Sequence, residues 1–202
     1  MHKIHKDILS LSLLLLLGYT MNAQSDIKLQ SSNHYKDGKF INAEIQHELK
    51  LSQMPSIIYD SIFHKSKNSV PKKKIPVLEL SKQDLENLED NTVVRFNHST
   101  LFFKIDGKFI LTDPMFSQRA SPFSFIGPKR FHKPPIDIEN LPYIDAVVLS
   151  HDHYDHLDEQ SIKALKDKVG IFYVPLGVSK ILQDFKVDKN KIVELDWHNS
   201  ST

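Results

Sequence analysis

The chain has 202 residues, of which 40% are hydrophobic and 25% are charged. These proportions fit one ordinary globular domain and exclude a fibrous or largely disordered chain. The formal net charge of +1 gives no reason to expect a nucleic-acid partner. The chain has no cysteine, so disulfide bonds and thiolate metal ligands are excluded as well.

Residues 1–23 are predicted to be a secretory signal peptide. The stretch starts with basic residues, continues with a short apolar run over residues 8–17 and ends at the small residue Ala23. The apolar run is too short for a bilayer, which needs about 20 residues. We therefore expect an exported protein, periplasmic or extracellular. The alternative is membrane association through an uncleaved N-terminal segment.

Residues 24–75 are expected to be a polar N-terminal extension or linker. The region holds one helical pattern, near residues 41–51, and a lysine-rich stretch over residues 65–74. The lysines could attract anionic lipid headgroups in a peripheral membrane contact, but a solvated linker is the favoured interpretation. No binding site is predicted there.

A domain is predicted over residues 76–202, and it begins with a short helix and three strands. Ser81 and Asp84 have the spacing of a capping box, which predicts a helix to about residue 88. The turn signal Asp106-Gly107 predicts a hairpin. The sheet should therefore start antiparallel, with strands in three runs rich in valine and phenylalanine: residues 92–96, 101–105 and 108–111.

The densest group of chemically active side chains follows the apolar run 144–149, a predicted strand. Imidazole nitrogens and carboxylate oxygens suit zinc, manganese or iron. Side chains two apart at the end of a strand project the same way and can hold one ion, while an adjacent pair would more naturally reach a second ion. The alternative is a polar loop with solvated histidines. The candidate ligands are His151, His153, Asp155 and His156.

Two other segments are expected to border this group. Asp113 ends the third strand, because Pro114 cannot continue it, and should lie near the strand end that carries His151. Residues 117–142 are rich in proline and should lack regular structure. The basic side chains of this loop would face either a phosphate or solvent: Arg119, Lys129 and Arg130.

After the candidate ligands, helices and strands alternate. Asp158 is placed to cap the first helix. The alternation predicts parallel strand pairing, and with the antiparallel start it predicts a mixed sheet. The expected elements are a helix at residues 159–168, a strand at 171–174, a helix at 177–185 and a strand at 191–195.

Several motifs together resemble a known family. The pattern H-x-H-x-D-H after a strand resembles the metallo-beta-lactamase fold, a superfamily of mostly dizinc hydrolases. Four further segments narrow the resemblance to the N-acyl-phosphatidylethanolamine-hydrolysing phospholipase D branch and its bacterial relatives: residues 95–100, 111–116, 119–122 and 127–131. The resemblance implies a mixed α+β and α/β fold with four αββα layers, of which this chain supplies an incomplete, N-terminal portion.

The resemblance also implies a function. It predicts a zinc-dependent hydrolase in which a metal-bound hydroxide cleaves a phosphodiester in a phospholipid or a small molecule. One zinc ion would be held by His151 and His153, and a second by Asp155 and His156. Asp155 would also orient the nucleophile. Tyr154 would contact substrate or simply pack, and Asp113 would support the metal-binding loop without binding metal.

In the family, a third histidine, a bridging aspartate and a final histidine complete the two metal sites. Only His198 follows His156 in this sequence, and it is a poor candidate for those roles. We therefore expect the N-terminal half of the enzyme. The alternative is an inactive fragment or remnant that binds metal weakly without catalysis. The oligomeric state is not predicted.

Overall fold

The computed structural model describes residues 29–42, 44, 51–64, 66–121, 125 and 127–201. The chain divides into two compact units, residues 1–53 and 54–202. Within the described part of the first unit, β1 (Tyr35–Lys36) and β2 (Lys39–Phe40) form a small antiparallel sheet. The predicted signal peptide, residues 1–23, lies outside the described residues.

Helix α2 (Met54–Phe63) was not predicted from the sequence. Pro55 lies in its first turn, where proline is tolerated because the missing N–H would have no partner within the helix. The helix expected near residues 41–51 is absent at residues 41, 42 and 44, and residue 51 begins a short 3-10 helix (Leu51–Gln53). Residues 43 and 45–50 fall outside the described part. Among the described helices, none is long and apolar enough to span a lipid bilayer.

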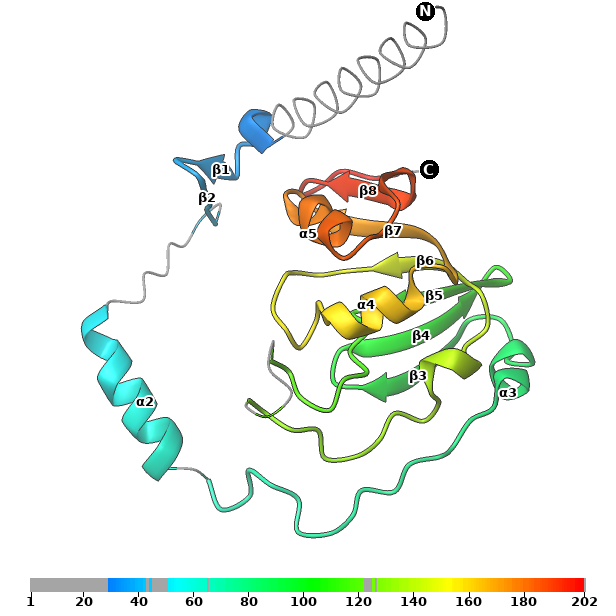
Figure 1. Cartoon of the computed structure of the whole chain (residues 1–202), viewed down its shortest axis with the longest axis horizontal. Coiled ribbons are helices and arrows are strands. Elements are labelled where there is room, and N and C mark those ends of the chain that lie inside the picture. Colours follow the sequence, from blue (N-terminus) through cyan, green and yellow to red (C-terminus); the bar gives the residue numbers. More distant parts are fainter. Residues whose placement is uncertain are drawn as a thin grey trace, which may run out of the picture. The chain divides into compact units, whose positions relative to one another are not determined.

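The second unit is built on a six-stranded sheet with the strand order β3-β4-β5-β6-β7-β8 (Figure 1). The first three strands pair antiparallel and the last four pair parallel, so the predicted mixed sheet is confirmed. The strands are β3 (Thr92–Asn97), β4 (Thr100–Ile105), β5 (Lys108–Thr112), β6 (Ile144–Val148), β7 (Val169–Pro175) and β8 (Ile192–Leu195).

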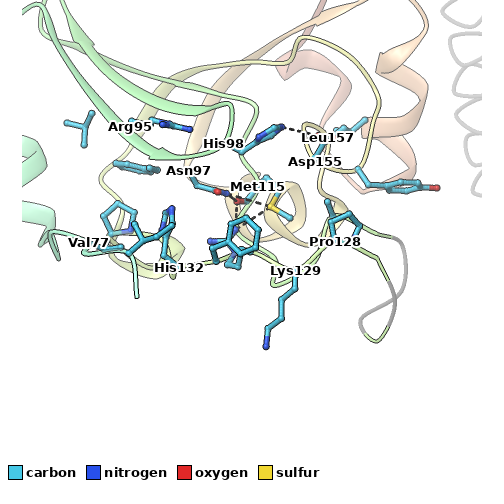
Figure 2. Close-up of a pocket in the computed structure, with 18 of the residues that line it drawn as sticks. Val77, Arg95, Asn97, His98, Met115, Pro128, Lys129, His132, Asp155 and Leu157 are labelled. Carbon is cyan, nitrogen blue, oxygen red and sulfur yellow. Dashed lines mark hydrogen bonds and ion pairs between the residues drawn. The ribbon is translucent and has the colours of Figure 1, made fainter. Parts of the chain in front are cut away.

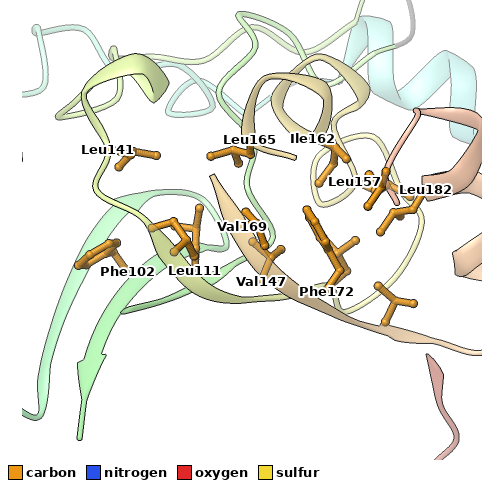
Figure 3. Packing of buried hydrophobic residues seen from close by; sticks show 14 of the residues in the cluster. Phe102, Leu111, Leu141, Val147, Leu157, Ile162, Leu165, Val169, Phe172 and Leu182 are labelled. Carbon is orange, nitrogen blue, oxygen red and sulfur yellow. The ribbon is translucent and has the colours of Figure 1, made fainter. Parts of the chain in front are cut away.

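Helices α4 (Glu159–Leu165) and α5 (Val178–Asp184) pack on the sheet (Figure 1). Figure 3 shows Phe102 and Phe172 of the sheet with Ile162 and Leu182 of the helices, and all four are 0% exposed. Burying each such side chain contributes about 1.5–3 kcal/mol. This buried core between the sheet and the two helices supports the loops at the edge of the sheet.

The opposite face of the sheet is less buried. Val93 and Val148 on this face are 55% and 39% exposed. Their cross-strand partners lie on the same face, because side chains of paired residues project to the same side. These partners keep partial exposure: Phe103, Thr112 and Tyr173.

Two carboxylates stabilise helix α3 and the turn between β4 and β5. Helix α3 (Lys82–Glu86) has the predicted capping box: Ser81 Oγ accepts from Asp84 N at 3.2 Å, and Asp84 Oδ2 accepts from Ser81 N at 2.8 Å. At the turn between β4 and β5, Asp90 accepts from the backbone N–H groups of Asp106 and Gly107, each at 3.0 Å. The capping box and the hairpin turn were both readable from local sequence.

Candidate metal centre

The candidate ligands lie on the loop between β6 and α4, at the carboxyl end of β6. Since β5 and β6 are parallel, their carboxyl ends meet at the same edge of the sheet. Asp113 follows β5 directly, and its backbone N–H donates to Val148 O at 3.0 Å. Asp113 therefore lies beside the metal-ligand loop, as predicted.

The side chain of Asp113 is only 8% exposed and connects two points of this loop. Oδ1 accepts from Ser150 N at 2.8 Å, and Oδ2 accepts from Ser150 Oγ at 2.8 Å. Oδ2 also lies 2.8 Å from His156 Nδ1. A carboxylate can only accept, so His156 carries its proton on Nδ1 and keeps Nε2 available as a metal ligand.

Ser150 fixes the position of the proton on the His151 ring in the same way. Because the Ser150 hydroxyl donates to Asp113, its oxygen accepts from His151 Nδ1, which lies 2.9 Å away. Nε2 of His151 is then the free nitrogen. The His151 ring packs 3.9 Å from the His156 ring and 4.6 Å from the His153 ring, measured between centroids.

The surroundings of His151 favour its neutral form. Burial, and after it the neighbouring His156 and His153 rings, lower the pKa of His151 below its ordinary value. A ring that resists protonation is available to bind a metal ion at lower pH.

Asp155 and His156 meet a third side chain, His98. Asp155 Oδ2 lies 3.0 Å from His98 Nε2 and 3.6 Å from His156 Nε2, and the three ligand atoms all fall within 4.8 Å of one another. In a tetrahedral zinc site with bonds of about 2.1 Å, neighbouring ligand atoms lie about 3.4 Å apart. The three atoms therefore have approximately the spacing of a shared ion.

The charge of Asp155 is stabilised by its surroundings. Partial burial acts to raise the pKa of Asp155. A hydrogen bond from its own backbone and the nearby His156 and His98 rings outweigh burial and leave the pKa below its ordinary value. The carboxylate is therefore ionised, which is the form that binds metal.

Sequence reasoning did not assign a role to His98, although its segment contributed to the family resemblance. His98 follows β3, which runs in the same direction as β5 and β6, so its turn lies at the same edge of the sheet. A histidine at the carboxyl end of a co-directional strand was the available signal. Using it required the strand order, which one sequence does not contain.

The structure thus divides the predicted ligands. Asp155 and His156 belong to the three-residue group with His98, while His151 lies outside that group and its ring contacts the rings of both His156 and His153. The assignment of all four as ligands stays a prediction. The role of Asp113 as a support for the loop also stays a prediction, and its contacts are those that the role requires.

The other end of the loop is fixed by Asp158, whose predicted capping role is wrong. Asp158 occupies the N-cap position of α4 but makes no side-chain cap. Its carboxylate instead accepts from Ser117 N at 3.0 Å, from Ser117 Oγ at 2.8 Å and from the hydroxyl of Ser161. The carboxylate therefore binds the distant residue Ser117 instead of the backbone N–H groups at the start of α4. The helix also ends at Leu165, earlier than the predicted residue 168.

A pocket of about 1460 Å³ opens beside the loop (Figure 2). His98, His153 and Asp155 contribute to one part of its lining, together with Tyr154, which is 56% exposed. The remainder is largely apolar, and includes Ile75, Val77, Leu78, Leu88, Val94 and Phe131.

The basic residues of the loop 117–142 are used in different ways. Arg130 donates to Ser117 O at 2.8 Å and to Met115 O at 2.7 Å, and its Nη1 is buried without a hydrogen-bond partner among the described residues. Arg119 donates to Gly127 O at 2.5 Å. Lys129 is exposed and borders the pocket (Figure 2). Both arginines therefore brace the loop through backbone carbonyls.

Residues 108–202 match the family model described as the Beta-lactamase superfamily domain. The mixed sheet with helices agrees with this match. The resemblance to the phospholipase D branch is also confirmed. Over 133 residues the chain is 35% identical to N-acyl-phosphatidylethanolamine-hydrolyzing phospholipase D 1 of Caenorhabditis elegans, which covers 63% of this chain and 37% of the worm protein.

A protein of Mycobacterium tuberculosis, described as uncharacterized, is 39% identical over 180 residues, which is 85% of this chain and 46% of that protein. The chain spans less than half the length of these two curated relatives. Among solved structures, the isothiocyanate hydrolase from Delia radicum gut bacteria is 26% identical, with a TM-score of 0.43 over 54% of this chain and 43% of that chain.

Proposed function

We propose that this chain contributes ligands to the metal centre of a zinc-dependent hydrolase of the phospholipase D type. The observation that carries the proposal is the contact set of Asp113 and Ser150. These two side chains occupy Nδ1 of His156 and of His151, so both rings keep Nε2 for a metal ion. In a polar loop with merely solvated histidines, a buried carboxylate that fixes the tautomer of a histidine ring would have no function.

The donor set fits zinc. The available atoms are imidazole nitrogens and a carboxylate oxygen, which are common ligands in catalytic zinc sites. His151 and His153 would hold one ion, and Asp155 and His156 would hold a second. Zinc would supply an acidified water and neutralise charge that develops on a phosphodiester oxygen. Asp113 and Ser150 would orient the ligand rings, and Asp155 would also orient the nucleophile.

The similarity to the Caenorhabditis elegans phospholipase D supports a phosphodiester substrate. The apolar lining beside Tyr154 and Asp155 suits a substrate with an apolar part, such as a phospholipid. Tyr154 is exposed in this pocket and available to contact the substrate. Fold similarity alone is a weak guide to substrate, so other phosphodiesters, lactones and amides belong in the same assay.

The test is a zinc titration of the wild-type chain and of the double variant His151→Ala/His153→Ala, followed by a phosphodiesterase assay. The control is His64→Ala, because His64 pairs with Asp60 at 2.7 Å on an exposed surface and is not one of the predicted metal ligands. We expect zinc binding in wild type and control, and a loss of at least about tenfold in affinity in the double variant. Equal zinc binding by all three proteins would contradict the proposal.

A second candidate is metal binding without catalysis. It is favoured by the grouping of the ligand atoms: among the described residues, only those of His98, Asp155 and His156 form a group within 4.8 Å of one another, although the His151 ring packs against the His156 ring. Two ions that are not held about 3.5–4 Å apart cannot act as one clamp on a phosphodiester. Zinc binding without turnover of any substrate in the assay would select this candidate.

Export of the protein is also a proposal, based on the basic, apolar and small residues of positions 1–23. Protein recovered outside the cytoplasm should begin near Gln24 in an N-terminal mass analysis. Exported protein that retains Met1 would instead indicate an uncleaved membrane anchor.

A further inference from the structure

His98 lies outside the loop of predicted ligands, but its ring reaches that loop (Figure 2). Its Nε2 is 3.0 Å from Asp155 Oδ2, across 57 residues of sequence. The ring also meets the His156 ring nearly edge-on, with 5.3 Å between centroids. We propose that His98 is a positioning residue: it donates a hydrogen bond from Nε2 to Asp155 and so holds this carboxylate ready to bind metal. The inference rests on the proposed zinc site.

The backbone of His98 gives an independent reason to assign it a role. Its φ is +33°, in a region that residues with a Cβ rarely adopt and that glycine enters freely. Such a conformation costs on the order of 1 kcal/mol. A histidine at a position where glycine would be more stable indicates that the ring itself contributes something.

The turn that carries His98 is fixed to the same segment that supports the metal-ligand loop. Asn97 Nδ2 donates to Met115 O at 3.0 Å, and Thr100 Oγ1 donates to Asp113 O at 2.7 Å. The turn is therefore fastened on both sides of His98. Through Asp113, the turn is connected by hydrogen bonds to the ring of His156.

Asp155 benefits from such a partner because its side chain is 40% exposed and is free to rotate without one. A carboxylate has two oxygens and about four lone-pair sites, so a hydrogen bond from His98 leaves capacity for a metal ion. The competing role for His98 is that of a metal ligand. The two roles exclude each other, because Nε2 cannot donate a hydrogen bond and bind a metal at once.

Two substitutions separate these roles. His98→Gly removes the ring and relieves the backbone, whereas His98→Gln removes the imidazole but retains an N–H donor of similar reach. The matched control is His64→Gln, which changes the exposed His64–Asp60 pair in the same way. Zinc affinity is measured by competition with a chromophoric chelator, and the melting temperature is measured on metal-free protein.

We expect His98→Gly to bind zinc about tenfold more weakly while its melting temperature does not fall. His98→Gln should recover zinc affinity to within about threefold of wild type, and His64→Gln should match wild type. A His98→Gln variant as weak as His98→Gly would overturn the positioning role in favour of direct ligation. Wild-type affinity in His98→Gly would overturn the inference alone, and a wild-type chain that binds no zinc would overturn the proposed function together with it.

Discussion

At each end of strand β5, a turn is stabilised by hydrogen bonds to the carboxylate of an aspartate. The two aspartates differ in the groups that donate to them. At its amino end, exposed Asp90 accepts from the backbone of Asp106 and Gly107. At its carboxyl end, buried Asp113 accepts from the backbone and hydroxyl of Ser150 and from the His156 ring. The first carboxylate fixes a turn only, whereas the second fixes a turn and orients a candidate ligand.

This difference shows how a structural device becomes part of a site. Both turns contain residues with positive φ, at Asp106, Gly107 and Asp113. The two turns differ in burial. Water competes less for a hydrogen bond to the buried carboxylate of Asp113 than for one to the exposed carboxylate of Asp90, so the buried carboxylate holds its partners more tightly. The two ends of β5 therefore provide matched positions for substitution.

The largest effect is expected from Asp113→Asn. Asparagine tolerates the positive φ, but its amide group presents a donor to either Ser150 N or His156 Nδ1, which are donors themselves. Zinc affinity should fall about 10- to 100-fold, and the free energy of unfolding should fall by about 1–3 kcal/mol. Chelator competition and chemical denaturation measure the two quantities.

The control at the other end of the strand is Asp90→Asn. This substitution should lower the free energy of unfolding by less than about 1.5 kcal/mol, because the exposed N–H groups of Asp106 and Gly107 can bind water instead. It should leave zinc affinity unchanged. Equal losses of zinc affinity in the two variants would remove the distinction between the two ends.

How far the sequence predicted this arrangement depends on the range of the interaction. The strands of the six-stranded sheet, the turn at Asp106-Gly107 and the Ser81 capping box depend on neighbouring residues, and these were predicted, whereas the small sheet of β1 and β2 was not. The partnership of His98 with Asp155 was missed because it joins residues that only the strand order brings together.

Asp158 shows the converse error. An aspartate before a helix usually caps it, and the sequence supported that prediction. In the folded chain its carboxylate binds Ser117, which is 41 residues away, and the local cap is not made. Tertiary hydrogen bonds that compete with local ones cannot be read from sequence spacing.

A smaller effect is expected from Ser150→Ala. This substitution removes the hydroxyl that joins Asp113 to His151. Zinc affinity should fall about tenfold and the free energy of unfolding by about 1 kcal/mol. The matched variant is Ser117→Ala, whose hydroxyl also donates to a carboxylate but reaches no ring. It should lose similar stability and retain zinc affinity, and a loss of zinc affinity in both would make the effect a general one of loop stability.

The smallest effect is expected from Gly107→Ala. No atom lies within 4 Å of the added Cβ, so only the positive φ of +72° opposes the change. The cost should be about 1 kcal/mol in thermal or chemical unfolding, without a change in zinc affinity. Altered zinc binding would show that the two ends of β5 are coupled.

The most direct test is long-range ¹H–¹⁵N NMR of the histidine rings during zinc addition. The central claim is that Asp113 and Ser150 hold Nδ1 of His156 and His151 and leave Nε2 for metal. Zinc should therefore shift the Nε2 resonances of His151 and His156 while both Nδ1 atoms stay protonated. Zinc bound through either Nδ1, or no shift at either ring, would contradict the account.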